Sequence, residues 1–344
     1  MSDSHRVTAR DVAALASVSP ATVSKALSGK GAVHPDTRDR VLEAARQLAF
    51  QVTRRGRGEV ARGDLTVGVV TREPFNRRTG PMLLGVLERL TEHGIAMLVR
   101  DGGGDLARER EAVEALTRRS VDGFLISGGD AGCLVRPSFR EQLVAPSVYA
   151  LTASVDPRDV SVVADDRGGA RVAAQHLLTR GRRRLICILG PQEEEVATIK
   201  VDAVREVLHS RGAELATAPL CGGWTDEWGY TAVSRVLAEE TAFDGVVCGN
   251  DAIAAGVANA LQRAGLRIPA DVGVVGCDNR RGPVDALTPS LTSVDLMLPD
   301  VGREAANRLI AAMAGHGGEP GIAVIPSQLV PRDSTAVKGS EKEM

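Results

Sequence analysis

Two polar residues, Asn250 and Asp278, each come just after a short apolar segment that is expected to be a β-strand. Side chains at the carboxyl ends of parallel strands line the place where ligands bind. An amide and a carboxylate can bind paired hydroxyl or N–H groups, and burial makes each contact discriminating. Both residues have a structural alternative, since asparagine is a common helix cap and Asp278 could be a loop or capping acid. The pattern predicts a small-molecule site.

A second group of polar residues lies near the N-terminus, on a predicted helix from Pro20 to Leu27. Val23 and Leu27 define its apolar face, four residues apart. The small, hydroxyl and basic side chains that lie off this face can approach the major groove of DNA, where a lysine reaches a guanine edge or a phosphate. These side chains are Ala21, Thr22, Ser24 and Lys25. The alternative is a plain three-helix domain with a polar surface.

The flanking residues supply the helix boundaries that such a group needs. Thr8 with Asp11 predicts the start of a first helix. Ser19 is a cap for the second helix, and Pro20 is suited to its first position. Pro35 starts a third helix. Two short helices joined by a tight turn and closed by a third predict an all-α helix-turn-helix head.

Charge is distributed unevenly along the 344 residues. Residues 1–63 hold eleven lysines and arginines against six acidic residues, a balance of +5, while the rest hold thirty-one against thirty-eight, a balance of −7. A basic segment attached to an acidic body favours binding to a polyanion, with chance clustering on a solvated face as the alternative.

Several function classes are not supported by the composition. The five cysteines lie far apart without a CxxC pair, and the six histidines are scattered, so we expect no metal site, no catalytic set and no cofactor. The run Gly102–Gly104 lacks the Gly-Lys-Ser/Thr of a phosphate loop. No apolar run could span a bilayer, and the first ten residues lack the apolar part of a signal peptide. We therefore expect a cytoplasmic, non-enzymatic protein that does not contact membranes.

From Leu65 onward, β-rich segments alternate with amphipathic helical segments, which predicts parallel sheets covered on both faces. The length allows two such sheets, so the expected core is α/β, made of two doubly wound lobes with a ligand cleft between them. The expected strands are Leu65–Val70, Ile95–Val99, Gly123–Ser127, Ser147–Leu151, Leu185–Leu189, Gly245–Cys248 and Val272–Gly276.

The segments Val7–Ala13 and Val18–Leu27 resemble the head of the lactose/galactose-repressor family, which runs V-T-x-x-D-V-A and then V-S-x-x-T-V-S-R-x-L. The resemblance implies that Pro20, Ala21 and Lys25 lie where the family reads bases. It implies that hydroxyls and caps meet phosphates at Thr8, Ser19, Thr22 and Ser24. Lysine replaces the common arginine at position 25, and a single ammonium cannot form the bidentate fork of a guanidinium.

The segment after the head departs from the family. Gly56 replaces a helical alanine, and Glu59 replaces the leucine that enters the minor groove in family members. With Gly56 and Gly58 weakening the helix, we expect Arg54, Arg55 and Arg57 to bind DNA mainly through phosphates, or the segment to be a flexible basic linker without a DNA role.

The resemblance continues into the core, where Gly249–Gly256 matches N-D-x-x-A-x-G and Ile268–Asn279 matches P-x-D-V-x-V-V-G-x-D. The core is therefore similar to periplasmic binding proteins. The resemblance implies effector contacts at Asn250 and Asp278. It also implies contacts at Lys200, which stands where the family has an effector-binding arginine, and at Trp224, which stands where family members have a ring-stacking aromatic. The alternatives are an exposed helix lysine for Lys200 and a core tryptophan for Trp224. The acidic run Glu193–Glu195 is expected to be a solvated loop.

Together these features predict a transcription regulator, expected to be a repressor, that binds operator DNA as a homodimer under the control of a sugar-like effector. A solute-binding protein without a transcriptional role is the alternative; a dinucleotide-dependent enzyme is disfavoured because G-x-G-x-x-G is missing after the first strand. The expected division is a head at 1–50, a hinge at 51–63, a core at 64–335 and a polar tail at 336–344. Within the core, the N-lobe takes 64–164 with 295–320, and the C-lobe takes 165–294 with 321–335.

Overall fold

The computed structural model describes residues 8–28, 33–48, 65–73, 75–128, 135–143, 145–280, 282, 285, 287–317 and 319–336. Contacts between Cα atoms divide the chain into two compact units. The first comprises Met1–Asp130, Leu134–Val163 and Leu298–Ala323, and the second comprises Ala131–Cys133, Ala164–Met297 and Val324–Met344. We call the three N-terminal helices the head, the rest of the first unit the N-lobe, and the second unit the C-lobe.

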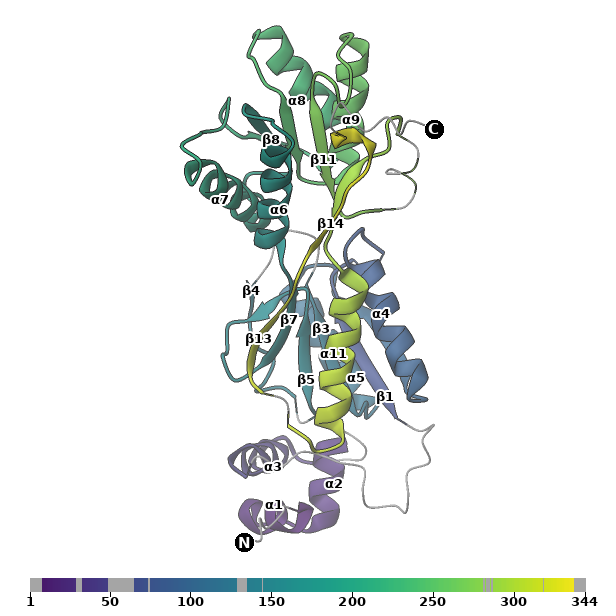
Figure 1. Cartoon of the computed structure of the whole chain (residues 1–344). Coiled ribbons are helices and arrows are strands. Elements are labelled where there is room, and N and C mark those ends of the chain that lie inside the picture. Colours follow the sequence, from purple (N-terminus) through teal and green to yellow (C-terminus); the bar gives the residue numbers. More distant parts are fainter. Residues whose placement is uncertain are drawn as a thin grey trace, which may run out of the picture. The chain divides into compact units, whose positions relative to one another are not determined.

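The head consists of α1 (Ala9–Ala16), α2 (Pro20–Ser28) and α3 (Pro35–Gln47), shown in purple in Figure 1. The predicted capping of α1 is confirmed: the Asp11 carboxylate accepts hydrogen bonds from the backbone N–H and the hydroxyl of Thr8, both at 2.7 Å. Small and β-branched side chains from all three helices form one core. Its buried members are Val12, Ala13, Ala16, Val23, Ala26, Leu27, Val41, Ala44 and Ala45.

The N-lobe is built on a six-stranded sheet in which the strand order is β13-β7-β5-β3-β1-β2. The pairings β2–β1, β1–β3, β3–β5 and β5–β7 are parallel. The strands are β1 (Thr66–Thr71), β2 (Ala96–Asp101), β3 (Gly123–Ser127), β5 (Ser147–Ala150), β7 (Val160–Ala164) and β13 (Gly321–Ile325). The short strands β4 (Val135–Arg136) and β6 (Ala153–Ser154) pair separately.

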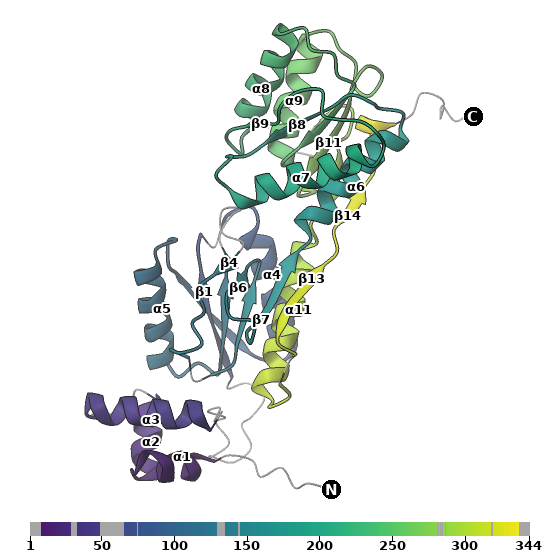
Figure 2. The same cartoon turned by 90° about the vertical axis from the view of Figure 1, so that its left-hand side faces the viewer.

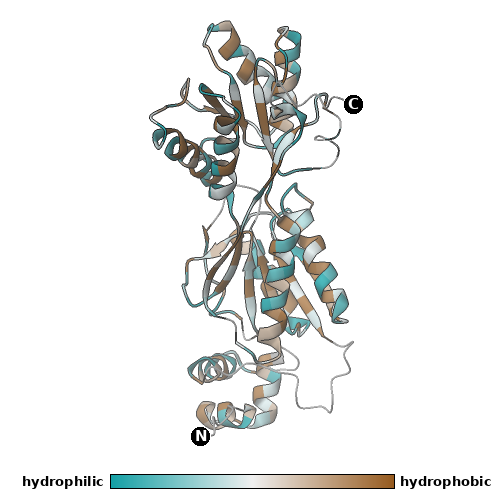
Figure 3. Ribbon diagram, viewed as in Figure 1, coloured by the Kyte–Doolittle hydropathy of each residue, from teal (hydrophilic) through white to brown (hydrophobic). Residues whose placement is uncertain are grey.

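Helices cover both faces of this sheet, as Figure 2 shows. Helix α5 (Leu106–Arg118) covers one face, where its apolar side packs with Phe124 and Tyr149. Helices α4 (Thr79–Glu92) and α11 (Leu298–Met313) cover the other. Central strands buried from both sides must be apolar, which explains the continuous hydrophobic segments of β1 and β3, whereas the edge strand β2 is mostly exposed; Figure 3 shows the hydropathy of the chain.

The C-lobe repeats this plan with the strand order β14-β12-β11-β10-β8-β9. All described pairings are parallel except that between β12 and β14. The strands are β8 (Leu185–Leu189), β9 (Leu220–Cys221), β10 (Gly245–Cys248), β11 (Gly273–Cys277), β12 (Thr292–Asp295) and β14 (Gln328–Val330). A 3-10 turn, η1 (Asp333–Thr335), follows β14.

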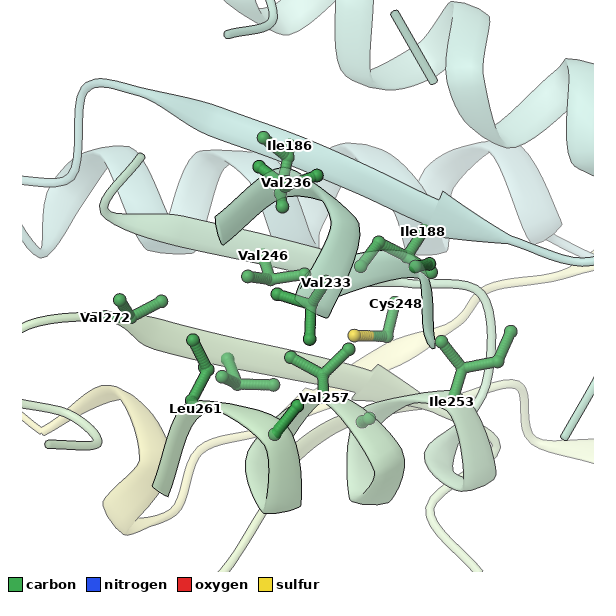
Figure 4. Close-up of a cluster of buried hydrophobic side chains, with 14 of the residues drawn as sticks. Ile186, Ile188, Val233, Val236, Val246, Cys248, Ile253, Val257, Leu261 and Val272 are labelled. Atoms are coloured by element: carbon green, nitrogen blue, oxygen red, sulfur yellow. The ribbon is translucent and has the colours of Figure 1, made fainter. Parts of the chain in front are cut away.

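The core of the C-lobe lies between this sheet and the helices α8 (Asp226–Ala238) and α9 (Asp251–Arg263). Figure 4 shows Ile188 and Val246 of the strands facing Val233 of α8 and Val257 of α9. Helices α6 (Asp166–Thr179) and α7 (Glu195–His209) pack together on the other face (Figure 1). Aliphatic residues fill this core, as the scarcity of aromatics in the sequence requires.

Glycines bring one helix pair of each lobe into close contact. A Cβ atom at Gly85 of α4 would lie 2.0 Å from the carbonyl oxygen of Pro299 in α11, and one at Gly256 of α9 would lie 1.8 Å from that of Asp226 in α8. Any larger residue at these positions would push the two backbones apart.

The predicted fold class, a helix-turn-helix head with an α/β core of two doubly wound lobes, is confirmed by these elements. The seven strands predicted from apolar segments are all present, with ends within two residues of the prediction. Alternation of β-rich and amphipathic segments was therefore sufficient to locate them.

Candidate functional site

The outer face of α2 carries the head's predicted site residues. Pro20, Ala21, Ser24 and Lys25 are exposed, and Thr22 is partly buried. Val23, Ala26 and Leu27 of the same helix are buried in the core of the head. A short helix with small side chains and one flexible cation on its open face can lie close to a polyanion without steric obstruction.

Ser19 and Thr8 combine two tasks at the helix starts. The Ser19 hydroxyl accepts a hydrogen bond from the backbone N–H of Thr22 at 3.1 Å and lies 2.9 Å from its hydroxyl. Both capping residues are exposed at the N-terminal ends of their helices, where the partial positive charge favours an anion. Their contact with phosphates stays a prediction. Arg54, Arg55 and Arg57 lie outside the described residues, as do Gly56, Gly58 and Glu59.

The other predicted residues lie together in the C-lobe, at the carboxyl edge of its sheet. Asn250 follows β10 and is 1 % exposed. Its Oδ1 caps α9 by accepting the Ile253 N–H at 2.8 Å, and its Nδ2 donates to the carbonyl oxygen of Trp224 at 3.1 Å. The capping alternative for Asn250 is thus correct, and the same bonds join it to a second predicted residue.

Trp224 is partly buried against the C-lobe core and covers two glycines that follow strands. A Cβ atom at Gly190, after β8, would lie 2.0 Å from its Cε2, and one at Gly249, after β10, would lie 2.8 Å from its Cζ3. The indole Nε1 donates to Oε2 of Glu194 at 2.9 Å. The run Glu193–Glu195 is therefore more than the solvated loop that the sequence predicted, because its middle residue orients the ring.

Lys200 of α7 is 4 % exposed, so the alternative of an exposed helix lysine is wrong. Its Nζ donates to the carbonyl oxygen of Gly249 at 3.1 Å and to Sγ of Cys277 at 3.3 Å, and lies 3.5 Å from Oδ1 of Asp166. A buried ammonium needs such a carboxylate partner. The pocket that Lys200 helps to line has a volume of about 10 Å³, enough for one water molecule but not for a sugar.

Asp278 follows β11 with a left-handed backbone conformation, at a φ of 100°. Its backbone N–H donates to the carbonyl oxygen of Val294 at 2.8 Å. The neighbouring acid Asp251, at the start of α9, is 1 % exposed. Burial raises the pKa of Asp251 to about 7, and the negative charge of Asp278 contributes to the rise.

Sequence reasoning did not identify Asp251, Asp166 and Glu194 as parts of this edge. Their partners come from other elements: Asp251 contacts Ser293 of β12, Asp166 contacts Lys200 of α7, and Glu194 contacts Trp224. Of these three acids, only Asp251 could have been suspected from the sequence. It forms a pair with Asn250 just after an apolar segment, where two successive polar residues indicate a polar site.

The chemistry of this edge suits binding through hydrogen bonds. Amide, carboxylate and indole groups offer donors, acceptors and an aromatic face for a polar ligand such as a sugar. Among the described residues no cluster of ligating side chains could hold a metal ion. Burial raises the pKa of the Cys187 thiol to about 12 and that of Cys277 to about 11, so both stay as unreactive thiols.

Within the described part of the chain, no helix is both long and apolar enough to cross a membrane.

Two family models match the chain. Residues 8–52 match the model for bacterial regulatory proteins of the lacI family, and residues 174–335 match a periplasmic binding protein-like domain. The first covers the helix-turn-helix with its exposed α2 face, and the second covers most of the C-lobe.

Known proteins match over nearly the whole chain. The transcriptional regulator CelR of Thermobifida fusca is 31 % identical over 96 % of this chain and 98 % of its own. The ribose operon repressor of Halalkalibacterium halodurans is 28 % identical over 97 % and 98 %. A solved complex of CelR with cellobiose has a TM-score of 0.65 and 28 % identity, covering 96 % of this chain and all of that chain.

A DNA-binding head joined to an effector-binding core defines a DNA-binding transcription regulator. The chain belongs to the lacI family of bacterial regulatory proteins. The family resemblance noted in the sequence is thereby confirmed.

Proposed function

We propose that this regulator is a repressor that binds a pseudo-palindromic operator and responds to a sugar-like effector. The observation that carries the proposal is the exposed face of α2, where Pro20, Ala21, Ser24 and Lys25 stand clear of the core. Placed in a major groove, Lys25 would reach base edges or phosphates while the hydroxyls of Ser19, Thr22 and Ser24 would bind phosphates. Thr8 would do the same at the start of α1. Since operator DNA lies in the bacterial cytoplasm, the protein acts there, without catalysis.

Reading two half-sites requires two heads, so the proposal includes a homodimer. The N-lobe offers a surface for it: in the part of the sheet that the structure describes, β2 is an edge strand next to β1, and it exposes Leu98 and Val99. The adjoining helix α4 exposes Leu84 and Leu87, one turn apart, to 60 % and 43 %. An exposed apolar edge strand favours pairing with another chain. A second copy of this chain is the occupant that a symmetric operator calls for.

The dimer surface is tested by changing both Leu84 and Leu87 to glutamate. We expect the wild type to sediment as a dimer and the double variant as a monomer with weakened operator binding. Leu106→Glu is the matched control, because that leucine is exposed to 37 % at the start of α5. A double variant that remains dimeric would exclude this surface.

The proposed effector-site residues are Asp278, Asn250, Trp224 and Lys200. Asp278 would accept hydroxyl hydrogen bonds, the Trp224 ring would stack on a sugar face, and Asn250 would orient both. Lys200 would act from beneath the edge, through Gly249 and Cys277. The CelR complex with cellobiose supports a sugar as the ligand class. An effector that binds one conformation of the core better than another would change operator affinity by that difference.

The hinge arginines Arg54, Arg55 and Arg57 complete the proposal as phosphate contacts. Changing each to glutamine should weaken binding to all DNA sequences alike and reduce the salt dependence by roughly one phosphate contact per residue. A sharp central kink in a DNA-bending assay would contradict this role, because it requires an apolar wedge rather than phosphate contacts.

The function itself is tested by gel shift with duplexes from the region upstream of the protein's own gene, at low ionic strength. We expect a discrete complex with DNA. We also expect that at least one of a set of sugars, beginning with cellobiose, either dissociates this complex or increases its affinity. Absence of any complex would contradict a DNA-binding repressor. A complex that ignores every sugar would contradict only the effector class.

A further inference from the structure

Asp251 has a place in the C-lobe that helix capping does not explain, because Asn250 already caps α9. Its Oδ1 lies 2.5 Å from the Ser293 hydroxyl of β12, and its Oδ2 accepts the backbone N–H of Arg280 at 2.8 Å. The carboxylate also lies against Gly276 of β11, where a Cβ atom would be 2.3 Å from Oδ1. One buried side chain thus joins the start of α9 to β11 and β12, two neighbouring strands of the sheet.

The segment that Asp251 holds is the loop Asp278–Arg280. Asp278 and Asn279 have φ values of 100° and 50°, conformations that cost free energy for residues other than glycine and persist only when surrounding contacts fix them. Three successive backbone N–H groups are bonded: that of Asp278 to Val294, that of Asn279 to the Ser293 hydroxyl at 3.1 Å, and that of Arg280 to Asp251. Two of the three anchors are therefore Asp251 and its partner Ser293.

We propose that Asp251 is a positioning residue of the effector site, which fixes the loop carrying Asp278 without touching the effector. The inference rests on the proposed role of Asp278 in effector binding. The two carboxyl oxygens of Asp251 accept the bonds, from the Arg280 N–H and the Ser293 hydroxyl, that keep Asp278 in place at the end of β11.

The charged groups around Asp251 come from each element that packs against it. Asp278 on the β11 loop opposes its ionisation, while the Ser293 bond, the Arg280 N–H and Arg332 after β14 favour it. Cys248 of β10 and Cys277 of β11 are thiols whose pKa values are raised by burial and by Asp251. Lys200 is bonded to Cys277 and pairs with Asp166. Burial is the largest influence and brings the pKa of Asp251 to about 7, so its protonation changes near neutral pH.

The test is hydrogen exchange of the full-length, ligand-free protein, followed in the peptide that contains Asn279 and Arg280 and corrected for the intrinsic effect of pH. Asp251→Ala should speed exchange at these amides at least tenfold. Asp251→Asn should stay within twofold of the wild type, because its amide keeps an acceptor for Arg280 and a hydrogen-bonding group for Ser293.

Asp226→Asn is the matched control, because Asp226 is also the first residue of a C-lobe helix behind a capping residue, but is exposed. It should behave like the wild type. The proposal is overturned if Asp251→Ala leaves loop exchange unchanged. Should Asp251→Ala not fold, Ser293→Ala removes the companion anchor and should speed exchange at Asn279.

A second measurement uses cellobiose as the probe. A loop that has lost its anchor should bind cellobiose at least tenfold more weakly, so Asp251→Ala should show this loss and Asp251→Asn should not. If cellobiose does not bind the wild type, cellobiose is not the effector, while loop exchange still decides the role of Asp251.

Discussion

The outer face of α2 and the carboxyl edge of the C-lobe sheet both carry predicted functional residues, but they hold them in opposite ways. Lys25 is exposed on a short helix, whereas Lys200 is 4 % exposed and is bonded to Gly249, Cys277 and Asp166. An exposed side chain such as Lys25 contributes little to the stability of the fold, because it has few contacts in the free protein. A side chain in a buried network, such as Lys200, contributes to stability as well as to the binding site. Substitutions in the two regions should therefore separate loss of function from loss of stability.

The largest effect should come from Lys200→Met. The change leaves Asp166 as a buried carboxylate without its ammonium partner, which typically costs about 3–5 kcal/mol. Tryptophan fluorescence during urea unfolding measures it, since both tryptophans, Trp224 and Trp228, lie in the C-lobe. Lys200→Met with Asp166→Asn should recover much of the loss by removing the stranded charge. A loss below about 1 kcal/mol would mean that Lys200 is not part of a buried network.

The next effect is a pH dependence of C-lobe stability. Because burial raises the pKa of folded Asp251 to about 7, well above that of an exposed aspartate, its contribution is fully present below pH 4 and is lost as pH rises through 7. From pH 5 to pH 8 the wild type should lose about 2–3 kcal/mol of unfolding free energy relative to Asp251→Asn. Parallel stability curves for the two proteins would contradict the raised pKa.

Lys25→Glu should have the opposite effect to the C-lobe substitutions: operator affinity should fall, and the free energy of unfolding should not change. Replacing a cation that faces DNA by an anion should cost about 1–2 kcal/mol per head, roughly five- to thirtyfold in affinity. Fluorescence anisotropy with a labelled operator measures it at fixed salt. Arg211→Glu, at an exposed C-lobe position, makes the same change in net charge and should bind DNA like the wild type. Equal loss in both variants would point to overall charge rather than to α2.

Ser19→Ala should have the smallest effect. Ser19 combines features of both regions, because it is exposed like Lys25 and also accepts a hydrogen bond that stabilises the fold. It removes the bond from the Thr22 N–H and should destabilise the start of α2 by about 1 kcal/mol. Hydrogen exchange of α2 measures the loss, with Ser24→Ala as a control because that exposed residue lies inside the helix. If α2 exchanges equally in both variants, Ser19 is not a significant cap.

The same contrast explains how much could be predicted from the sequence. The capping of α1, the proline at the start of α2 and the seven core strands depend on local patterns, and each was predicted correctly. The environment of Lys200 was not, because its burial depends on Asp166, thirty-four positions away, and on the ends of two strands. The contact of Glu194 with Trp224 and that of Asp251 with Ser293 likewise join segments that the sequence separates.

The central claim is that α2 reads operator DNA, and selection of bound duplexes from a random pool tests it most directly. Full-length wild-type protein should enrich an inverted repeat with half-sites one helical turn apart, and Lys25→Glu should lose that enrichment while its C-lobe unfolds as before. Enrichment of no motif by the wild type, or of the same motif by Lys25→Glu, would contradict the account.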